Sequence, residues 1–258
     1  METEEPLKHQ HVIGVDEVGW GCVAGPIVVC AASVPFGHWD TLRKQGFRDS
    51  KQVGNRLVVS KSPRTRYTKK TCDSLAQWLN EPEQQGLATW AIAEVDAIKI
   101  DLDDNPMASK NAAFRTAIMR LMQANGWTSD DVTIIVDGNQ LIPLPPTFVQ
   151  EAIPKADDSV MPVAVASILA KSKRDQFMRH LAHQYGTFGF ENHVGYPTPQ
   201  HMKAVFTYGP IKGVHRMRTI KPMVLNWYTN EYCYKQQKRN PPPAWLVNTG
   251  WLGEAYAR

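Results

Sequence analysis

The chain of 258 residues carries 29 Lys and Arg against 25 Asp and Glu, which gives a net charge of +4, and 43% of its residues are hydrophobic. This length fits one large domain, or a domain with an extension, around a sizeable core. The mild positive charge permits a polyanionic partner without requiring one. No apolar run approaches the ~18 residues of a membrane-spanning helix. The acidic N-terminus has no signal-peptide pattern, so we expect a cytoplasmic protein with no membrane partner.

The four cysteines lie far apart in the sequence, with no CxxC spacing between them; they are Cys22, Cys30, Cys72 and Cys233. A zinc site and a disulfide framework are therefore not expected. Cys30 falls in an apolar run, where a buried free thiol is the usual state.

The first elements are two apolar runs joined by a glycine-rich turn. Residues 12–18 have the pattern of a strand and contain two adjacent carboxylates, Asp16 and Glu17, near its end. The turn leads into a second strand over residues 27–34. Carboxylates next to glycine-rich backbone, which no side chains obstruct, could hold hard cations against a phosphodiester. The simpler alternative is an ordinary hairpin with a charged tip.

The middle of the chain alternates between polar and periodic segments. Residues 43–70 are basic and polar, which favours a solvated loop over a flap facing a polyanion. Four elements are expected after it: a short helix at 71–80, a strand-like run within 87–99, a helix at 107–124 and a strand at 132–136 that leads into Asp137.

The longest predicted helix begins after Asp157, with Asp158 or Ser159 as its cap and Pro162 in its first turn, and runs to about residue 185. Residues 186–222 are rich in glycine, proline, histidine and basic side chains. The last segment is aromatic and basic with little periodicity. Strands followed by helices, with one early hairpin, indicate a mixed α/β domain.

Four carboxylates stand beside the ends of predicted elements, where side chains distant in sequence can meet: Asp16, Glu17, Asp137 and Asp157. Together they would repel one another unless cations neutralise them or their pKa values rise. Two Mg²⁺ or Mn²⁺ ions about 4 Å apart suit such an all-oxygen site and hydrolyse phosphodiesters. Taken singly, a strand-ending turn at Asp137 and helix capping at Asp157 are the simpler interpretations.

Residues 16–26, DEVGWGCVAGP, resemble the opening motif of the ribonuclease HII family (type 2 ribonuclease H). Further family motifs follow in order: 49–51 (DSK), 136–139 (VDGN), 155–157 (KAD), 166–171 (ASILAK), 174–175 (RD), 195–201 (GYPTPQH), 209–210 (GP) and 215–216 (HR). The match extends from about residue 12 to 222.

The resemblance implies a ribonuclease H-like fold, with a mixed five-stranded sheet flanked by helices and a helical C-terminal part. It implies an endonuclease that cleaves the RNA strand of RNA–DNA hybrids and incises DNA at embedded ribonucleotides, leaving 5′-phosphate and 3′-hydroxyl ends. The family's metal ligands carry over to Asp16, Glu17, Asp137 and Asp157. We expect an arm at 1–11, a catalytic domain at 12–222, an extension at 223–258 and a monomer; the sequence does not reveal whether a clamp protein is a partner.

The resemblance also suggests residues that contact the substrate. The backbone of Gly19 and Gly21 would sense a ribose 2′-hydroxyl, against which Tyr196 would pack. Lys51 would contact a phosphate, and Lys155, Lys171 and Arg174 would add to the positive field. Trp20 stands where the family carries Arg or Lys, so we predict altered substrate preference or metal dependence rather than loss of activity.

Two alternatives to a ribonuclease HII enzyme are less favoured by the sequence. The sister ribonuclease HIII usually has an N-terminal substrate-binding domain, for which a catalytic strand at Val12 leaves no room. A nucleic-acid-binding module that lost catalysis, or changed specificity, is kept open by Trp20. The aromatic side chains of the C-terminal extension either stack on nucleic acid or, as we favour, pack back onto the domain: Trp227, Tyr228, Tyr232, Tyr234, Trp245 and Trp251.

Overall fold

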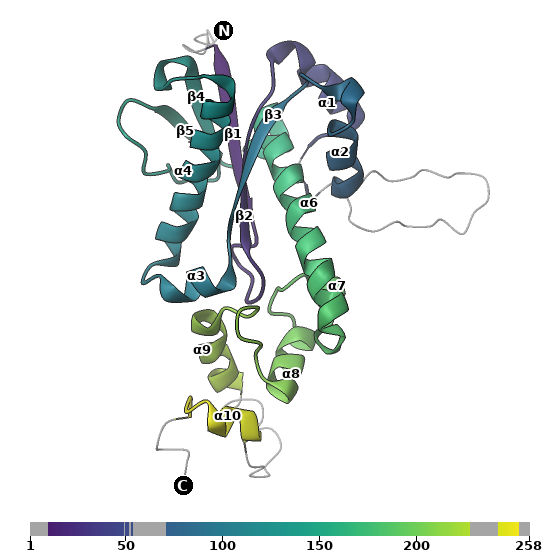
Figure 1. Ribbon diagram of the computed structural model, residues 1–258, viewed down its shortest axis with the longest axis vertical. Coiled ribbons are helices and arrows are strands. Elements are labelled where there is room, and N and C mark those ends of the chain that lie inside the picture. The colour runs from purple at the N-terminus through teal and green to yellow at the C-terminus, as the bar shows by residue number, and fades with distance from the viewer. Residues whose placement is uncertain (1–9, 49, 52, 54–70, 228–241, 253–258) are drawn as a thin grey trace, which may run out of the picture. The chain divides into compact units, whose positions relative to one another are not determined.

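A computed structural model gives the structure of the protein, which is described for residues 10–48, 50, 51, 53, 71–227 and 242–252 (Figure 1). The chain divides into two compact units, each built from segments that are separate in sequence. Unit 1 consists of Met1–Val18, Ile27–Val95 and Met107–Arg174. Unit 2 consists of Gly19–Pro26, Asp96–Pro106 and Asp175–Arg258. Each unit has a hydrophobic core of its own.

Unit 1 contains a five-stranded sheet in the order β3-β2-β1-β4-β5. The strands are β1 (His11–Val18), β2 (Ile27–Ser33), β3 (Thr89–Val95), β4 (Val132–Asp137) and β5 (Val149–Ile153). β1 is antiparallel to β2 and parallel to β4, while β2–β3 is antiparallel and β4–β5 parallel. The predicted mixed five-stranded sheet is confirmed.

The register of β1 and β4 places two of the predicted acids at one edge of the sheet. Val15 pairs with Val136, so Asp16 and Asp137 are the next residues along two parallel strands. Parallel strands end at the same edge, which is where ligands bind in open α/β sheets. The apolar content of both strands thus brings two acids together.

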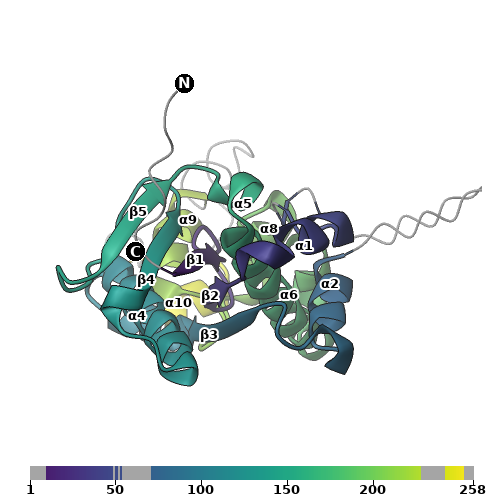
Figure 2. The same cartoon turned by 90° about the horizontal axis from the view of Figure 1, so that it is seen from above.

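Helices cover both faces of the sheet, with α4 on one face and α1, α2 and α6 on the other (Figure 2). The helices of unit 1 are α1 (Trp39–Gln45), α2 (Cys72–Leu79), α4 (Pro106–Asn125), α5 (Ala156–Ser159) and the first part of α6 (Met161–Gln184). Because both faces are covered, all seven residues of β2 are buried.

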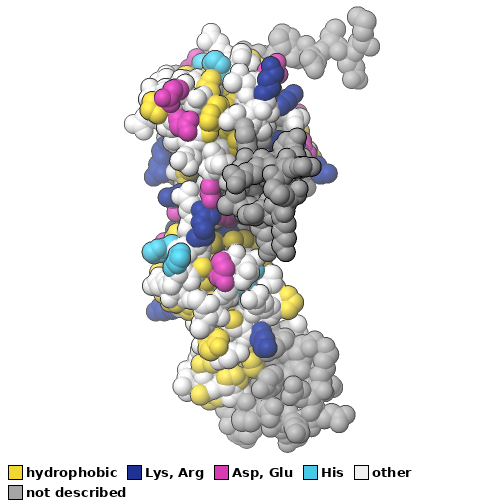
Figure 3. Space-filling model, turned by 90° about the vertical axis from the view of Figure 1, so that its right-hand side faces the viewer, with side chains coloured by type: hydrophobic (Ala, Val, Ile, Leu, Met, Phe, Trp, Pro, Cys, Tyr) yellow, Lys and Arg dark blue, Asp and Glu magenta, His cyan; other side chains and the backbone are white. Residues whose placement is uncertain are grey.

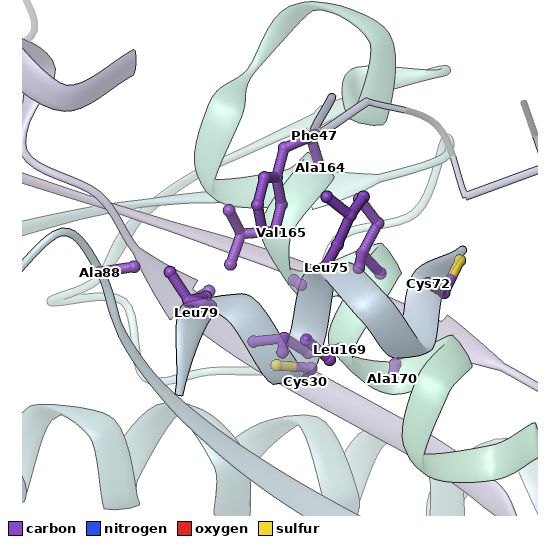
Figure 4. Packing of buried hydrophobic residues seen from close by; sticks show 14 of the residues in the cluster. Cys30, Phe47, Cys72, Leu75, Leu79, Ala88, Ala164, Val165, Leu169 and Ala170 are labelled. Carbon is purple, nitrogen blue, oxygen red and sulfur yellow. The ribbon is translucent and has the colours of Figure 1, made fainter. Parts of the chain in front are cut away.

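The core between β2, α2 and α6 is built from small and branched side chains. Cys30 of β2, Leu75 of α2 and Leu169 of α6 belong to this cluster (Figure 4). α2 begins with a capping box in which the Thr71 and Ser74 side chains each bond the other's backbone N–H. The three cysteines among the described residues are free and buried, as predicted for Cys30.

Unit 2 is helical. Besides the end of α6 it contains α3 (Ala97–Leu102), α7 (Phe190–His193), α8 (Pro199–Tyr208), α9 (Met217–Trp227) and α10 (Ala244–Asn248). Its core includes Phe190, Val205 and Ile220, which are fully buried. Leu246 of α10 joins them, and Trp245 Nε1 donates a hydrogen bond of 2.8 Å to the carbonyl of Phe206. The expectation that the extension packs back holds for this part of it, and Tyr228, Tyr232 and Tyr234 lie outside the described residues.

Several elements differ from the sequence-based expectations. The short helices α1, α3 and α5, the individual helices α7 to α10 and the edge strand β5 were not predicted. The expected strand-like run at 87–99 ends at Val95 because α3 begins at Ala97, and α6 begins at Met161, after the separate helix α5, rather than at a cap on Asp158 or Ser159. The 3₁₀ turns at Phe36–His38, Pro82–Gln84, Ser129–Asp131 and Gly186–Phe188 were not predicted either. α9 continues across the expected boundary at 222/223. Within the described part of the chain, no helix has both the length and the apolar character needed to span a bilayer.

Candidate active site

Three of the four predicted acids meet at the edge of the sheet in unit 1. Asp16 comes from β1, Asp137 from the end of β4, and Asp157 from the short helix α5. One carboxylate oxygen of each lies within 4.8 Å of the others. Asp16 and Asp157 are only 8% and 4% exposed, so this is a largely dehydrated cluster of like charges.

Burial raises the pKa of Asp16 to about 8. A hydrogen bond from Ser167 lowers this pKa, and the negative charges of Glu17 and Asp137 raise it further. A carboxyl group held in this way favours either a proton or a cation. Because oxygen ligands suit Mg²⁺ and Mn²⁺, the residues present fit a divalent metal ion.

Backbone and hydroxyl groups fix the orientation of these carboxylates. The Ala156 N–H donates to Asp137 Oδ1 at 2.9 Å, and the Glu17 N–H donates to Asp16 Oδ1 at 2.7 Å. The Ser167 hydroxyl, which bonds Asp16, also lies 2.9 Å from the hydroxyl of Ser50. Ser50 and Ser167 belong to two motifs of the sequence, but their contact with the acids was not predicted.

Glu17 lies beside this cluster and has a cationic partner. Its Oε1 is 3.3 Å from Nζ of Lys110 on α4. Burial raises the pKa of Glu17, and Lys110 counteracts part of that rise. Sequence reasoning missed Lys110, although it stands one turn before Phe114 on the apolar side of α4, where a lysine is unexpected.

A basic hollow of about 530 Å³ lies on the Asp157 side of unit 1. Arg43, Lys44 and Arg48 line it together with Asp157, Asp158 and the start of α6. These three bases are exposed, and none forms an ion pair with another described residue. On the face drawn in Figure 3, basic and acidic side chains are interspersed among the described residues.

The basic residues predicted to contact the substrate or to attract it differ in accessibility. Lys51 and Lys155 are exposed, and Lys171 is partly buried. Arg174 is fully buried, so its part at the substrate stays a prediction of positive field rather than of direct contact. Lys155 has a left-handed φ of 60°, two residues before Asp157, which is strained for a residue with a side chain.

The Gly19–Gly25 loop in unit 2 is held by one buried arginine. Arg216 is 2% exposed and donates from Nε and Nη2 to the Gly25 carbonyl at 3.1 and 2.9 Å. Its Nη1 donates to the Trp20 carbonyl at 3.1 Å. Gly19 has φ 95°, which only glycine adopts without strain. The Trp20 side chain is 39% exposed, so the loop is fixed through its backbone while the indole faces outward.

Tyr196 lies next to this loop within unit 2. A Cβ placed on Gly21 would be 3.9 Å from Tyr196 Cε1, and the Val23 N–H donates to the Gly195 carbonyl at 2.9 Å. Tyr196 is 44% exposed, so its ring is accessible to a ligand. Two residues earlier, Val194 adopts φ 43°, an uncommon conformation for a β-branched residue. The structure therefore brings Gly19, Trp20, Gly21 and Tyr196 together.

Three buried histidines support the Tyr196 turn, a role that was not predicted. The His201 ring bonds the Tyr196 carbonyl through Nδ1 at 2.8 Å, and its Nε2 lies 3.2 Å from Nε2 of His215. His193 stacks on His201 at 4.1 Å between ring centroids. Burial lowers the pKa of His201 to about 4 and that of His215 to about 3. The rings of His201 and His215 are thus neutral at pH 7 and act as fixed hydrogen-bonding groups.

A buried carboxylate cluster, fit for metal ions, at the edge of a β3-β2-β1-β4-β5 sheet is typical of nucleases of ribonuclease H-like architecture. The sequence model of the ribonuclease HII family matches residues 13–221. The chain belongs to the ribonuclease HII family.

Relatives and solved structures agree with this assignment. Ribonuclease HII of Chlorobium phaeobacteroides is 35% identical over 80% of this chain and 87% of its own, and that of Thermosynechococcus vestitus is 32% identical over 84% and 86%. The crystal structure of ribonuclease H2 from Pyrococcus horikoshii superimposes with a TM-score of 0.63 at 25% identity, covering 85% of this chain and all of the other. Ribonuclease HIII from Bst, solved with Mn²⁺, shares the fold at 19% identity and a TM-score of 0.57, over 83% of this chain and 68% of the other.

The protein is accordingly a hydrolase: a ribonuclease HII endonuclease acting on RNA–DNA hybrids, with a carboxylate cluster fit for metal ions. The alternative of a binding module without catalysis is therefore wrong.

Proposed function

We propose that this protein also incises DNA at single embedded ribonucleotides, using two Mg²⁺ or Mn²⁺ ions held by Asp16, Glu17, Asp137 and Asp157. The observation that carries the proposal is the meeting of three of these carboxylates within 4.8 Å. Such ions supply an activated water and stabilise the leaving oxygen of an in-line displacement. The products would carry 5′-phosphate and 3′-hydroxyl ends.

The glycine-rich loop is the proposed sensor of the ribose. A 2′-hydroxyl is both donor and acceptor, and the backbone of Gly19 and Gly21 offers groups of both kinds to a sugar that approaches closely. Tyr196 would pack against that sugar. Arg216 supports this role because it holds the Trp20 and Gly25 carbonyls and so keeps the loop in one conformation.

A duplex with one ribonucleotide tests the proposal directly. We expect a cut on the 5′ side of the ribonucleotide with Mg²⁺ or Mn²⁺, no cut with EDTA, and no cut of the all-DNA duplex. Cleavage of a long hybrid with no cleavage of the single-ribonucleotide duplex would contradict it.

Trp20→Arg is expected to strengthen substrate binding. The guanidinium would add one phosphate contact. Arg216 holds the loop through the backbone carbonyls of Trp20 and Gly25, which the substitution keeps, so the loop should stay in place. KM should fall about tenfold, and the slope of log KM against log salt should steepen by about 1. Trp20→Phe, which adds no charge, is the control. Unchanged rates, and an unchanged ratio between single-ribonucleotide and hybrid substrates, would show that Trp20 does not set substrate preference.

The basic hollow is a proposed site for substrate phosphates, beside Lys51 and Lys155 as further contacts. The variant Arg43→Gln/Arg48→Gln should raise KM about tenfold, leave kcat unchanged, and reduce the salt slope by about 1 for each lost contact. Arg120→Gln, on α4, removes a charge elsewhere in unit 1 and serves as control. Equal KM and equal salt dependence in both variants would contradict the phosphate site.

The remaining assignments stay predictions: a monomer, a cytoplasmic location, and a catalytic domain at 12–222 between an arm at 1–11 and an extension at 223–258. Size-exclusion chromatography with light scattering would test the first.

A further inference from the structure

Lys110 is an unusual residue to find at a carboxylate site that takes metal ions. Its side chain is 13% exposed, its Nζ lies 3.3 Å from Glu17 Oε1, and the same Nζ lies 5.7 Å from the centroid of the Phe114 ring. A nearly buried ammonium is costly unless a charged partner compensates it. Lys110 is therefore held at Glu17 by packing on one side and by charge on the other.

Lys110 and the acids share one small hollow of about 120 Å³. Glu17 and Asp137 line it, together with Lys110, Asn111 and Asn139. Glu17 also senses the charge of Asp137. The ammonium thus occupies the side of the acid cluster where Glu17 would offer its oxygens to a cation.

We infer that the Lys110 ammonium occupies the position beside the Glu17 carboxylate where a divalent ion would bind, and that it competes with this ion for Glu17. This inference rests on the proposed metal-binding role of Glu17. A divalent ion at Glu17 has to displace the ammonium from the carboxylate, and the ammonium then stays nearby and repels the ion. Lys110 therefore weakens binding at this position relative to the Asp16, Asp137 and Asp157 cluster, and it sets the metal concentration at which the centre fills.

Mn²⁺ titration of the substrate-free protein by calorimetry tests this inference without reference to activity. Lys110→Met removes the charge and keeps an apolar stem beside Phe114. We expect its weaker Mn²⁺-binding step to tighten by about tenfold or more, since a unit charge at about 4 Å contributes on this scale even in a polar surrounding. Lys110→Arg keeps a cation at Glu17 and should bind Mn²⁺ no more tightly than the wild type. Arg120→Met removes one charge from the same helix away from the acids and should leave the affinity unchanged.

A double-mutant cycle with Glu17→Gln shows whether the effect passes through Glu17. In the Glu17→Gln background, Lys110→Met should change the weaker step by much less than in the wild type. Thermal unfolding confirms that each variant is folded; if Lys110→Met is not, Lys110→Gln takes its place. An unchanged Mn²⁺ affinity in the charge-removing variant, or a gain equal to that of Arg120→Met, would overturn the inference. Absence of Mn²⁺ binding by the wild type would instead overturn the proposed metal centre itself.

Discussion

Asp16→Asn is expected to abolish cleavage and, in the same molecule, to stabilise the metal-free protein at high pH. The loss of cleavage follows from removing a ligand from the three-carboxylate cluster. Metal ions contribute several kcal/mol to such reactions, and about 4 kcal/mol corresponds to roughly 10³-fold in rate. The variant should therefore retain less than about one thousandth of the wild-type kcat/KM on a hybrid substrate.

The gain in stability follows from the raised pKa of Asp16. In the folded protein this pKa is about 8, against 3.8 for an unperturbed aspartate. Between these values the folded state binds more protons than the unfolded state, so the free energy of unfolding falls as pH rises from about 4 to about 8. Asparagine removes that titration, and the variant should lose less stability over this window than the wild type does.

Urea unfolding in EDTA at pH 5, 7 and 9 measures this difference. With each increase in pH, the free energy of unfolding of the wild type should fall relative to that of Asp16→Asn. Saturating Mn²⁺ should restore the stability of the wild type, because the ion binds the ionised carboxylates. Asp130→Asn, an exposed acid in a turn of unit 1, should keep both the activity and the pH dependence of the wild type. Parallel pH profiles for the wild type and Asp16→Asn would show that Asp16 is already ionised in the folded protein.

The sequence could predict the strands that carry the acids and the acids themselves, but not every element around them. The apolar runs of β1 and β4 and the carboxylates at their ends are local patterns, so the strands and the candidate ligands followed from them. The edge strand β5 has exposed or half-buried residues throughout, and α1 is only seven residues long. Neither leaves a periodic pattern strong enough to identify it.

The sequence also could not predict contacts between side chains that lie far apart in the chain. The contact between Glu17 and Lys110 joins residues 93 positions apart, and the hydroxyl contact between Ser50 and Ser167 joins residues 117 apart. Periodicity gives no information on such pairs. The burial of Arg174, which was expected to add to the positive field at the substrate, is likewise not visible in the sequence. Burial of a charged side chain depends on what packs over it.

Gly14→Ala is expected to be the most destabilising single change considered, because β1 and α6 touch backbone to backbone at this glycine. A Cβ on Gly14 would lie 2.2 Å from the Val163 N and 2.4 Å from the Pro162 carbonyl carbon. Both are main-chain atoms, so no side-chain rotation relieves the clash, and strand and helix must separate. We expect a loss of about 3 kcal/mol or more in the free energy of unfolding.

Moving β1 and α6 apart should also displace Asp16 from Ser167, because β1 carries Asp16 and α6 carries Ser167, its hydrogen-bond partner. Gly14→Ala should therefore lose activity beyond its unfolded fraction, seen as a lower kcat per folded molecule at low temperature. Gly37→Ala is the matched control, since a Cβ there meets no atom within 4 Å. If the two alanine variants unfold at the same urea concentration, the close approach of β1 and α6 does not hold the site together. If only Gly14→Ala loses stability and activity, the close spacing of β1 and α6 at Gly14 is what places Asp16 of β1 within hydrogen-bonding distance of Ser167 on α6.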